Sequence, residues 1–134
     1  VLLDANFSKD GKKLAFISSS RDHKEAHLKI ADVKTGNVKS IYNEVTKTYY
    51  ESGVNGENWR VFFKSNEFLW YSEKDDWGHL YLHDWTTGKL KNQITSGEWL
   101  VRDVLHVDEL KREIFFTGGG KEEGNPYHMS IYIK

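Results

Sequence analysis

Apolar residues in this chain come in short runs, most of which alternate with polar residues, and turn-forming residues separate the runs. A period of two is typical of β-strands with one buried face. Helical periodicity is poor, and its one candidate, residues 22–30, rests only on Lys, Glu and Ala content. The expected strands lie at residues 14–17, 27–32, 38–42, 59–63, 68–71, 79–83, 90–95, 100–107, 114–117 and 129–133. The pattern therefore predicts an all-β protein.

The strands form a repeated supersecondary unit. The motif Asp32-x-x-Thr35-Gly36 returns as Asp84-x-x-Thr87-Gly88, an interval of roughly 50 residues. In such a motif Asp can accept hydrogen bonds from the turn backbone and Gly can adopt positive φ, which suits a hairpin between the third and fourth strands of a unit. A repeat of this length with four short strands is typical of a β-propeller blade. An ordinary antiparallel sandwich remains the alternative.

We expect one partial β-propeller domain of about three four-stranded antiparallel blades, with approximate bounds 1–44, 57–97 and 98–134. The fourth strand of the last blade would then follow Lys134. Propellers typically have four to eight blades, and an open arc exposes unpaired edge strands that favour association. Because the chain also begins with Val1 rather than Met, we interpret it as part of a longer polypeptide, and a homo-oligomer through the exposed edges stays open.

The composition narrows the class of protein. The chain has 134 residues, enough for one ordinary domain, and although only 38% are hydrophobic, the 14% that are aromatic supply much of the area for a core. A net charge of −1 argues against nucleic acid as a partner, since phosphate recognition needs an excess of Lys and Arg. No apolar run is long enough to span a membrane, and the absence of cysteine excludes disulfides and thiolate metal sites.

The catalytic and phosphate-binding motifs sought in this sequence are absent or lack required residues. The sequence contains no Gly-x-Ser-x-Gly, the motif of a nucleophile elbow. Residues 118–121 read GGGK, as in a phosphate-binding loop, but Phe115 stands at the required first glycine and Glu122 at the required Ser or Thr. We interpret this stretch as a flexible hairpin loop. The chain is therefore expected to have no catalytic residue and not to be an enzyme by itself.

Six histidines and a cluster of acids raise the question of a metal. His79 and His83 share one face of an expected strand, but four residues of strand span roughly 13 Å, too far for two ligands of one zinc ion. The order of residues 23–27, HKEAH, is not that of zinc peptidases, and the acids at residues 73–76 lack calcium-loop spacing. We expect surface or turn histidines, a solvated acidic hairpin tip, and no metal or cofactor.

The five tryptophans are suited either to stacking on a ligand or to packing in a core. Most of them lie within or beside expected strands, and one lies in the turn before Gly78. Packing within or between blades is therefore the expected role of Trp59, Trp70, Trp77, Trp85 and Trp99.

A longer pattern resembles a known family. Residues 59–60 read WR, residues 64–82 read KSNEFLWYSEKDDWGHLYL, residues 94–99 read ITSGEW and residues 120–127 read GKEEGNPY. Together they closely resemble the N-terminal β-propeller region of bacterial, Bacteroidetes-type dipeptidyl peptidase IV-like serine peptidases, within the prolyl oligopeptidase superfamily. The resemblance covers most of residues 57–134, whereas residues 5–42 resemble a generic blade.

The resemblance implies a parent enzyme with two modules, in which a propeller restricts entry to short peptides and a C-terminal α/β-hydrolase domain carries Ser, Asp and His. The family's pair of glutamates for the substrate amino terminus lies earlier in its propeller, and Glu122-Glu123 does not match its context. In related enzymes a loop near the second unit approaches the extended substrate pocket. It corresponds here to residues 53–60, which makes Trp59 and Arg60 the candidate substrate-binding residues, with strand packing and a salt bridge as the alternative.

Two functions stay open at this point. The first is a non-catalytic propeller segment of a secreted or periplasmic serine exopeptidase, which gates and positions peptide substrates for the hydrolase domain. The second is a stand-alone propeller-like module that binds proteins or glycans. A downstream Gly-x-Ser-x-Gly, followed by Asp and His, would distinguish the first from the second.

Overall fold

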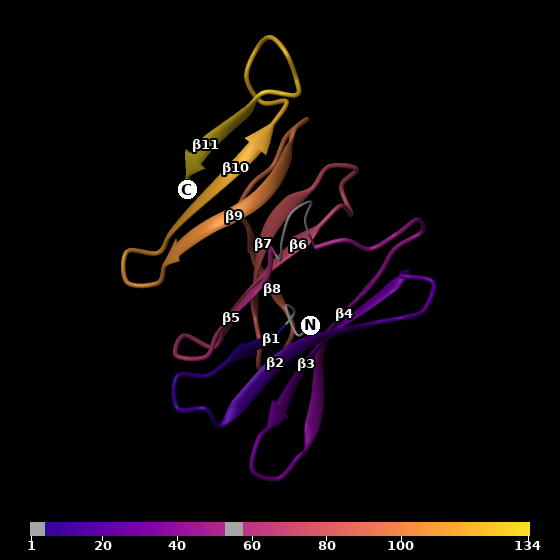
Figure 1. Cartoon of the computed structure of the whole chain (residues 1–134), viewed down its shortest axis with the longest axis vertical. Helices are drawn as coiled ribbons and strands as arrows, with labels where there is room; N and C mark the ends of the chain where they lie inside the picture. Colours follow the sequence, from indigo (N-terminus) through magenta and orange to yellow (C-terminus); the bar gives the residue numbers. More distant parts are fainter. Residues whose placement is uncertain (1–4, 53–57) are drawn as a thin grey trace.

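The computed structural model describes residues 5–52 and 58–134, and in this part of the chain all regular secondary structure is β-strand (Figure 1). The strands are β1 (Ala5–Phe7), β2 (Lys13–Ser19), β3 (Glu25–Asp32), β4 (Val38–Val45), β5 (Arg60–Phe62), β6 (Glu67–Ser72), β7 (His79–Asp84), β8 (Leu90–Gln93), β9 (Leu100–Asp108), β10 (Glu113–Gly119) and β11 (Met129–Ile133).

The strands form three antiparallel sheets in chain order, each a simple meander. The first sheet has the order β1-β2-β3-β4, the second β5-β6-β7-β8 and the third β9-β10-β11. In Figure 1 the sheets follow one another along the long axis of the molecule. The prediction of an all-β fragment built of consecutive antiparallel blades is confirmed. The helix candidate at residues 22–30 is wrong, because Ala26, Leu28 and Ile30 are buried with the period of a strand.

The repeated turn motif has the predicted geometry. The Asp32 carboxylate accepts hydrogen bonds from the backbone N–H and the hydroxyl of Thr35 at 2.8 and 3.0 Å. The Asp84 carboxylate accepts from the backbone N–H of Thr86 and Thr87 at 2.8 and 3.0 Å. Gly36 and Gly88 have φ of 73° and 74°, a region that glycine enters at low cost. Each motif closes the hairpin between the third and fourth strands of its sheet.

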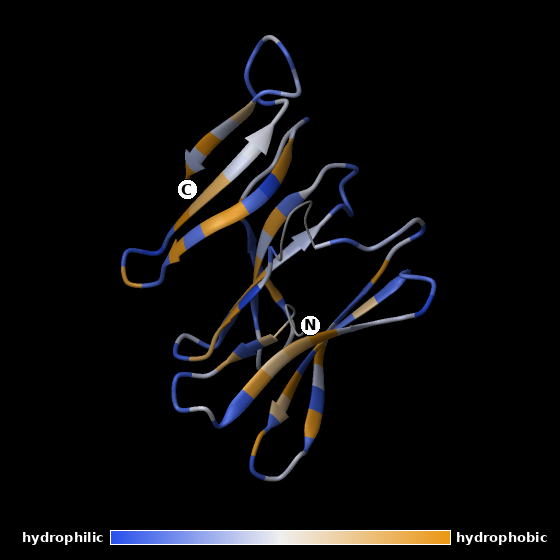
Figure 2. Ribbon diagram, viewed as in Figure 1, coloured by the Kyte–Doolittle hydropathy of each residue, from blue (hydrophilic) through white to orange (hydrophobic). Residues whose placement is uncertain are grey.

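The core lies in two layers, one on each side of the second sheet. One layer joins the first and second sheets around Leu28, Phe68 and Trp70, and the other joins the second and third sheets around Leu69 and Phe116. Every residue of β6 is buried as a result. In Figure 2 the hydrophobic positions gather on the strands and the hydrophilic positions on most of the connecting turns. The second sheet thus supplies core residues from both faces.

Candidate functional site

The segment that leads into β5 faces both neighbouring sheets in alternation. The side chain of Trp59, 1% exposed, packs in the layer between the first and second sheets together with Val61. Arg60 pairs across the ladder with Leu69, which belongs to the layer between the second and third sheets. Cross-strand partners share a face, so Arg60 emerges on the side of the third sheet, and it is exposed. Residues 53–57 of the predicted substrate-side loop lie outside the described residues.

Asn58 connects this segment to the third sheet. Its amide nitrogen donates to the backbone oxygen of Arg102 at 2.7 Å, and its Oδ1 accepts from the backbone N–H of Val104 at 2.7 Å. The side chain is only 1% exposed. Sequence reasoning missed this contact, because a lone Asn before a strand carries no signal of a partner more than 40 residues away.

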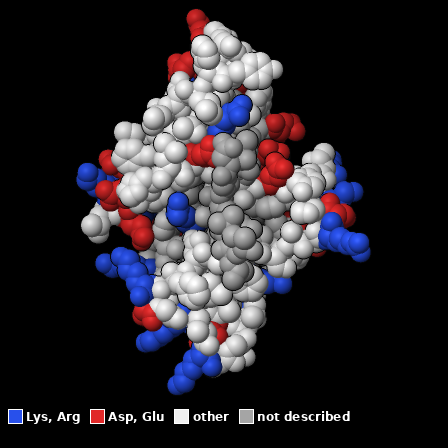
Figure 3. Space-filling model, in the orientation of Figure 1, with Lys and Arg blue, Asp and Glu red and all other residues white. Residues whose placement is uncertain are grey.

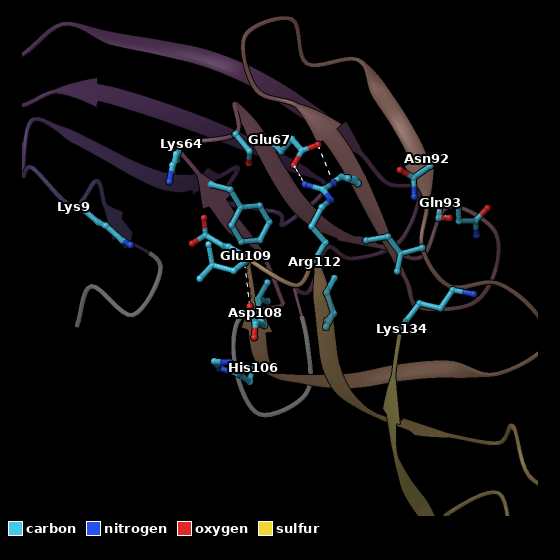
Figure 4. Close-up of a pocket in the computed structure, with 17 residues that line it drawn as sticks. Lys9, Lys64, Glu67, Asn92, Gln93, His106, Asp108, Glu109, Arg112 and Lys134 are labelled. Carbon is cyan, nitrogen blue, oxygen red and sulfur yellow. Dashed lines mark hydrogen bonds and ion pairs between the residues drawn. The ribbon is translucent and has the colours of Figure 1, made fainter.

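A groove of about 930 Å³ lies between the second and third sheets, at the end marked by the β5–β6 and β9–β10 turns (Figure 4). Its apolar side chains include Phe62, Leu82 and Ile114, which belong to the core layer beneath. The charged side chains labelled in Figure 4 belong to the second and third sheets, except for Lys9, which lies in the β1–β2 turn of the first sheet. The groove therefore combines an apolar floor with a rim of mixed charge.

Glu67 is the buried charge in this groove. Arg112 donates to both of its carboxylate oxygens, at 2.9 and 3.2 Å, and Lys91 forms a second ion pair with it. The side chain of Glu67 is 4% exposed, whereas Lys91 and Arg112 are 46% and 59% exposed. The hydrogen bonds from Arg112, with a smaller contribution from Lys91, lower the pKa of Glu67 to about 2 against the cost of burial. With its oxygens engaged in this way, Glu67 serves to join the two sheets.

A second buried carboxyl group joins the first and second sheets. Glu44 in β4 accepts hydrogen bonds from Trp70 Nε1 at 2.5 Å and from the Ser72 hydroxyl at 2.6 Å. Burial raises the pKa of Glu44, and the hydrogen bonds from Ser72 and Trp70 oppose that rise. The neighbouring Tyr42 has its pKa raised to about 12, first by burial and then by Glu44. Its ring lies edge-on to Trp70 at 5.2 Å between centroids.

The expectation that all six histidines lie on the surface or in turns is wrong for His79 and His83. Both are in β7 and almost fully buried. His79 contacts the Thr95 hydroxyl and the Gly97 carbonyl oxygen, at 3.0 and 2.9 Å. His83 Nδ1 lies 3.0 Å from the carbonyl oxygen of Gly88, and burial lowers the pKa of this imidazole. Within residues 5–52 and 58–134, no group of three or more His, Asp and Glu is placed to hold a metal ion.

Three further predictions concern the acidic turn, the tryptophans and the GGGK stretch. The acidic residues Glu73, Asp75 and Asp76 lie in the exposed β6–β7 turn, as predicted. Trp70 and Trp99 are buried, like Trp59, and pack in the two core layers, and Trp85 is partly buried against one of them. The expected packing role is wrong for Trp77, which is 38% exposed in the β6–β7 turn. The GGGK stretch is only partly a loop.

Gly118 and Gly119 in that stretch end β10 and pair with β9 and β11. A Cβ on Gly118 would lie 3.0 Å from the rings of Trp99 and Tyr132, so close packing explains this glycine.

On the face in Figure 3, Lys and Arg side chains are interspersed with Asp and Glu around the margin.

Three blade-like sheets, with buried carboxyl groups and aromatic layers between them, define a segment of a β-propeller. Residues 1–133 match the family model of the dipeptidyl peptidase IV (DPP IV) N-terminal region. The chain belongs to that family, and the resemblance seen in the sequence is confirmed. The family's N-terminal region is a non-catalytic part of a peptidase.

One curated protein is similar to part of this chain, and two solved structures share its fold. A probable dipeptidyl peptidase 4 of Trichophyton verrucosum is 35% identical over 68 residues, which are 51% of this chain and 8% of that protein. The crystal structure of a candidate dipeptidyl aminopeptidase IV from Bacteroides ovatus has a TM-score of 0.77 at 21% identity, over 97% of this chain and 20% of the other.

The structure of Porphyromonas gingivalis dipeptidyl peptidase 4 has a TM-score of 0.74 at 24% identity, over 96% of this chain and 17% of the other. The chain thus spans a fifth or less of the length of these relatives. In the part that the structure describes, no helix is long and apolar enough to cross a membrane.

Proposed function

We propose that this chain is the substrate-side part of the propeller of a dipeptidyl peptidase IV-like serine exopeptidase. It gates and positions peptide substrates for a C-terminal α/β-hydrolase domain that lies outside this chain. The observation that carries the proposal is the family match over residues 1–133. The three sheets then correspond to consecutive blades with the bounds 1–44, 57–97 and 98–134, and the parent enzyme acts in the periplasm or outside the cell.

Within this function, Arg60 is the residue that contacts substrate. It is exposed, while Trp59 beside it is buried and holds the strand in place. Its guanidinium is a fixed positive charge with five N–H donors, suited to peptide carbonyl oxygens and carboxylates. Because the contact lies away from the bond that is cleaved, it contributes to the binding of longer peptides and leaves the chemical step unchanged.

The test compares the variants Arg60→Ala and Arg21→Ala in the full-length protein that carries this segment. Arg21 is an exposed arginine in the β2–β3 turn and serves as the matched control. We expect Arg60→Ala to raise KM for peptides of five or six residues by about tenfold, which corresponds to one charge-assisted hydrogen bond. Hydrolysis of Gly-Pro or Ala-Pro chromogenic substrates should keep its kcat, and Arg21→Ala should change neither value.

Two results would overturn the proposal. One is hydrolysis of the chromogenic substrates by the purified 134-residue chain, since the proposal assigns the chemistry to another domain. The other is an unchanged KM for every peptide length in Arg60→Ala, which would remove the substrate-side role. A full-length protein without any peptidase activity would favour the alternative, a binding module unrelated to proteolysis.

A further inference from the structure

The side chain of Asn58 binds the edge of β9 where a neighbouring strand would otherwise pair. Among the strands that the structure describes, β9 is at the edge of the third sheet and has β10 as its one partner. The Arg102 carbonyl and the Val104 N–H both bind the Asn58 side chain, so these two backbone groups face the same edge of β9. The Asn58 amide satisfies both groups at once, with one donor and one acceptor at 2.7 Å. It thereby supplies one rung of a β-ladder from a side chain.

The contact coincides with an irregularity in β9. The register with β10 shifts between the pairs Asp103–Thr117 and Val101–Gly118, so Arg102 is the extra residue of a β-bulge. A bulge changes the direction of the strand and leaves local backbone groups without ladder partners. Asn58 binds at this point, and burial makes the loss of either hydrogen bond costly.

The same contact fixes the backbone around Arg60 from one side. Asn58 and Arg60 are two residues apart and both face the third sheet, whereas Trp59 and Val61 face the first. Trp59 packs in the core layer on its side, and the Val61 N–H also lies 3.4 Å from Asn6 Oδ1 in β1. The segment is therefore held between two sheets, and Arg60 extends from it into solvent.

We propose that Asn58 is a positioning residue for substrate binding. By joining the segment before β5 to the bulge of β9, it sets the place from which the Arg60 side chain reaches a bound peptide. This inference rests on the proposed function, because it concerns the same substrate-side site. Asn58 itself is buried and acts through Arg60.

The experiment uses the full-length protein and the variants Asn58→Ala, Asn58→Ser, Arg60→Ala, the double variant of Asn58→Ala with Arg60→Ala, and the control Asn92→Ala. Asn92 lies on the exposed strand β8. Hydrogen exchange is measured at the Val104 amide, and KM and kcat are measured for chromogenic dipeptides and for peptides of five or six residues. Asn58→Ser removes fewer atoms and keeps the test usable where the alanine variant folds poorly.

We expect exchange at Val104 to become at least about tenfold faster in both Asn58 variants, while the amides of β6 and β7 keep their protection. KM for the longer peptides should rise about three- to tenfold, with kcat on the dipeptides unchanged. The double variant should be no worse than Arg60→Ala, because the two residues act in series. Asn92→Ala should leave all of these values unchanged.

Three outcomes would overturn the inference. The first is an unchanged KM in Asn58→Ala and Asn58→Ser while Arg60→Ala raises it, which leaves the proposed function intact. The second is a double variant whose effects add, since independent action excludes positioning of one residue by the other. The third is an Arg60→Ala variant with unchanged KM, which refutes the substrate-side role itself and is recognised by that single variant.

Discussion

The variant Glu67→Gln tests how much a buried ion pair between blades contributes to stability. Glutamine keeps the shape of the side chain and removes its charge, so Arg112 and Lys91 lose a carboxylate that lies within hydrogen-bond reach of both. The pKa of Glu67 falls from 4.5 to about 2, and at about 1.4 kcal/mol per pKa unit the full shift corresponds to roughly 3.4 kcal/mol. Because solvent screens the two half-exposed cations, we expect a loss of about 2 kcal/mol.

The pH dependence has a definite sign. A carboxyl group whose pKa is lowered on folding stabilises the protein above its unfolded pKa, and this stability is lost as the pH falls toward the folded value. The difference between the wild type and Glu67→Gln should therefore be full at pH 6–7 and decline below about pH 4.5, toward pH 2. Urea unfolding followed by tryptophan fluorescence measures it at each pH.

The matched control is Glu109→Gln, which removes a carboxylate from an exposed position in the same groove. Its free energy of unfolding should stay within about 0.5 kcal/mol of the wild type. A loss below about 0.5 kcal/mol for Glu67→Gln at pH 7, or a loss that is constant between pH 7 and pH 3, would refute the assignment of Glu67 as an ionised link between blades.

Two further substitutions test the packing of the second sheet. In Gly78→Ala the new Cβ would lie 1.9 Å from the hydroxyl oxygen of Tyr71, whose ring is held in the core. Thermal or urea unfolding should therefore show that the free energy of unfolding falls by about 2 kcal/mol or more. An unchanged free energy of unfolding would contradict the close approach of this turn to the ring. In Trp70→Phe the buried Glu44 loses one donor, at a cost of about 2 kcal/mol at pH 7. The pKa of Glu44 is already raised and rises further in this variant, so the loss of stability should shrink as the pH falls and Glu44 takes up a proton. A loss of stability that grows toward low pH would contradict the role of Trp70 as a donor to the ionised Glu44.

The turn chemistry and the strands of the fold could be predicted because their causes are local. The Asp-x-x-Thr-Gly motifs carry their own hydrogen-bond partners, and both appear in the structure as expected. The alternating residues of β3 also determine a strand, which overrides the weak helical content of residues 22–30. What is encoded within a few residues could be derived from the sequence alone.

The histidines of β7 show why the rest could not be derived. The alternation of Leu80 and Leu82 with His79 and His83 indicates one buried and one solvated face. In a blade with a neighbour on each side both faces are buried, so the polar half of the alternation is buried as well. Two-sided burial in the middle of a repeat was therefore the signal that could have placed these histidines in the interior.

The buried polar residues of the site depend on partners that are distant in the sequence. Glu67 is bound by Arg112, Glu44 by Trp70, and Asn58 by the backbone of β9. Before the fold is known, each reads as an ordinary polar residue beside a strand. The predicted substrate-side pair, Trp59 and Arg60, was derived from family resemblance. Trp59 is buried in a core layer, and the role of Arg60 in binding stays a prediction.

The order of the sheets has a consequence for how the chain folds. Each sheet is made of hairpins between consecutive strands, and each sheet packs on the sheet that follows it in the sequence. Closing such short loops costs little entropy, so folding can begin within one hairpin and extend to its neighbours, as in repeat proteins with nearest-neighbour coupling. Of the three sheets described, the second has packed faces on both sides. The second sheet therefore carries the packing through which the first and third sheets are coupled.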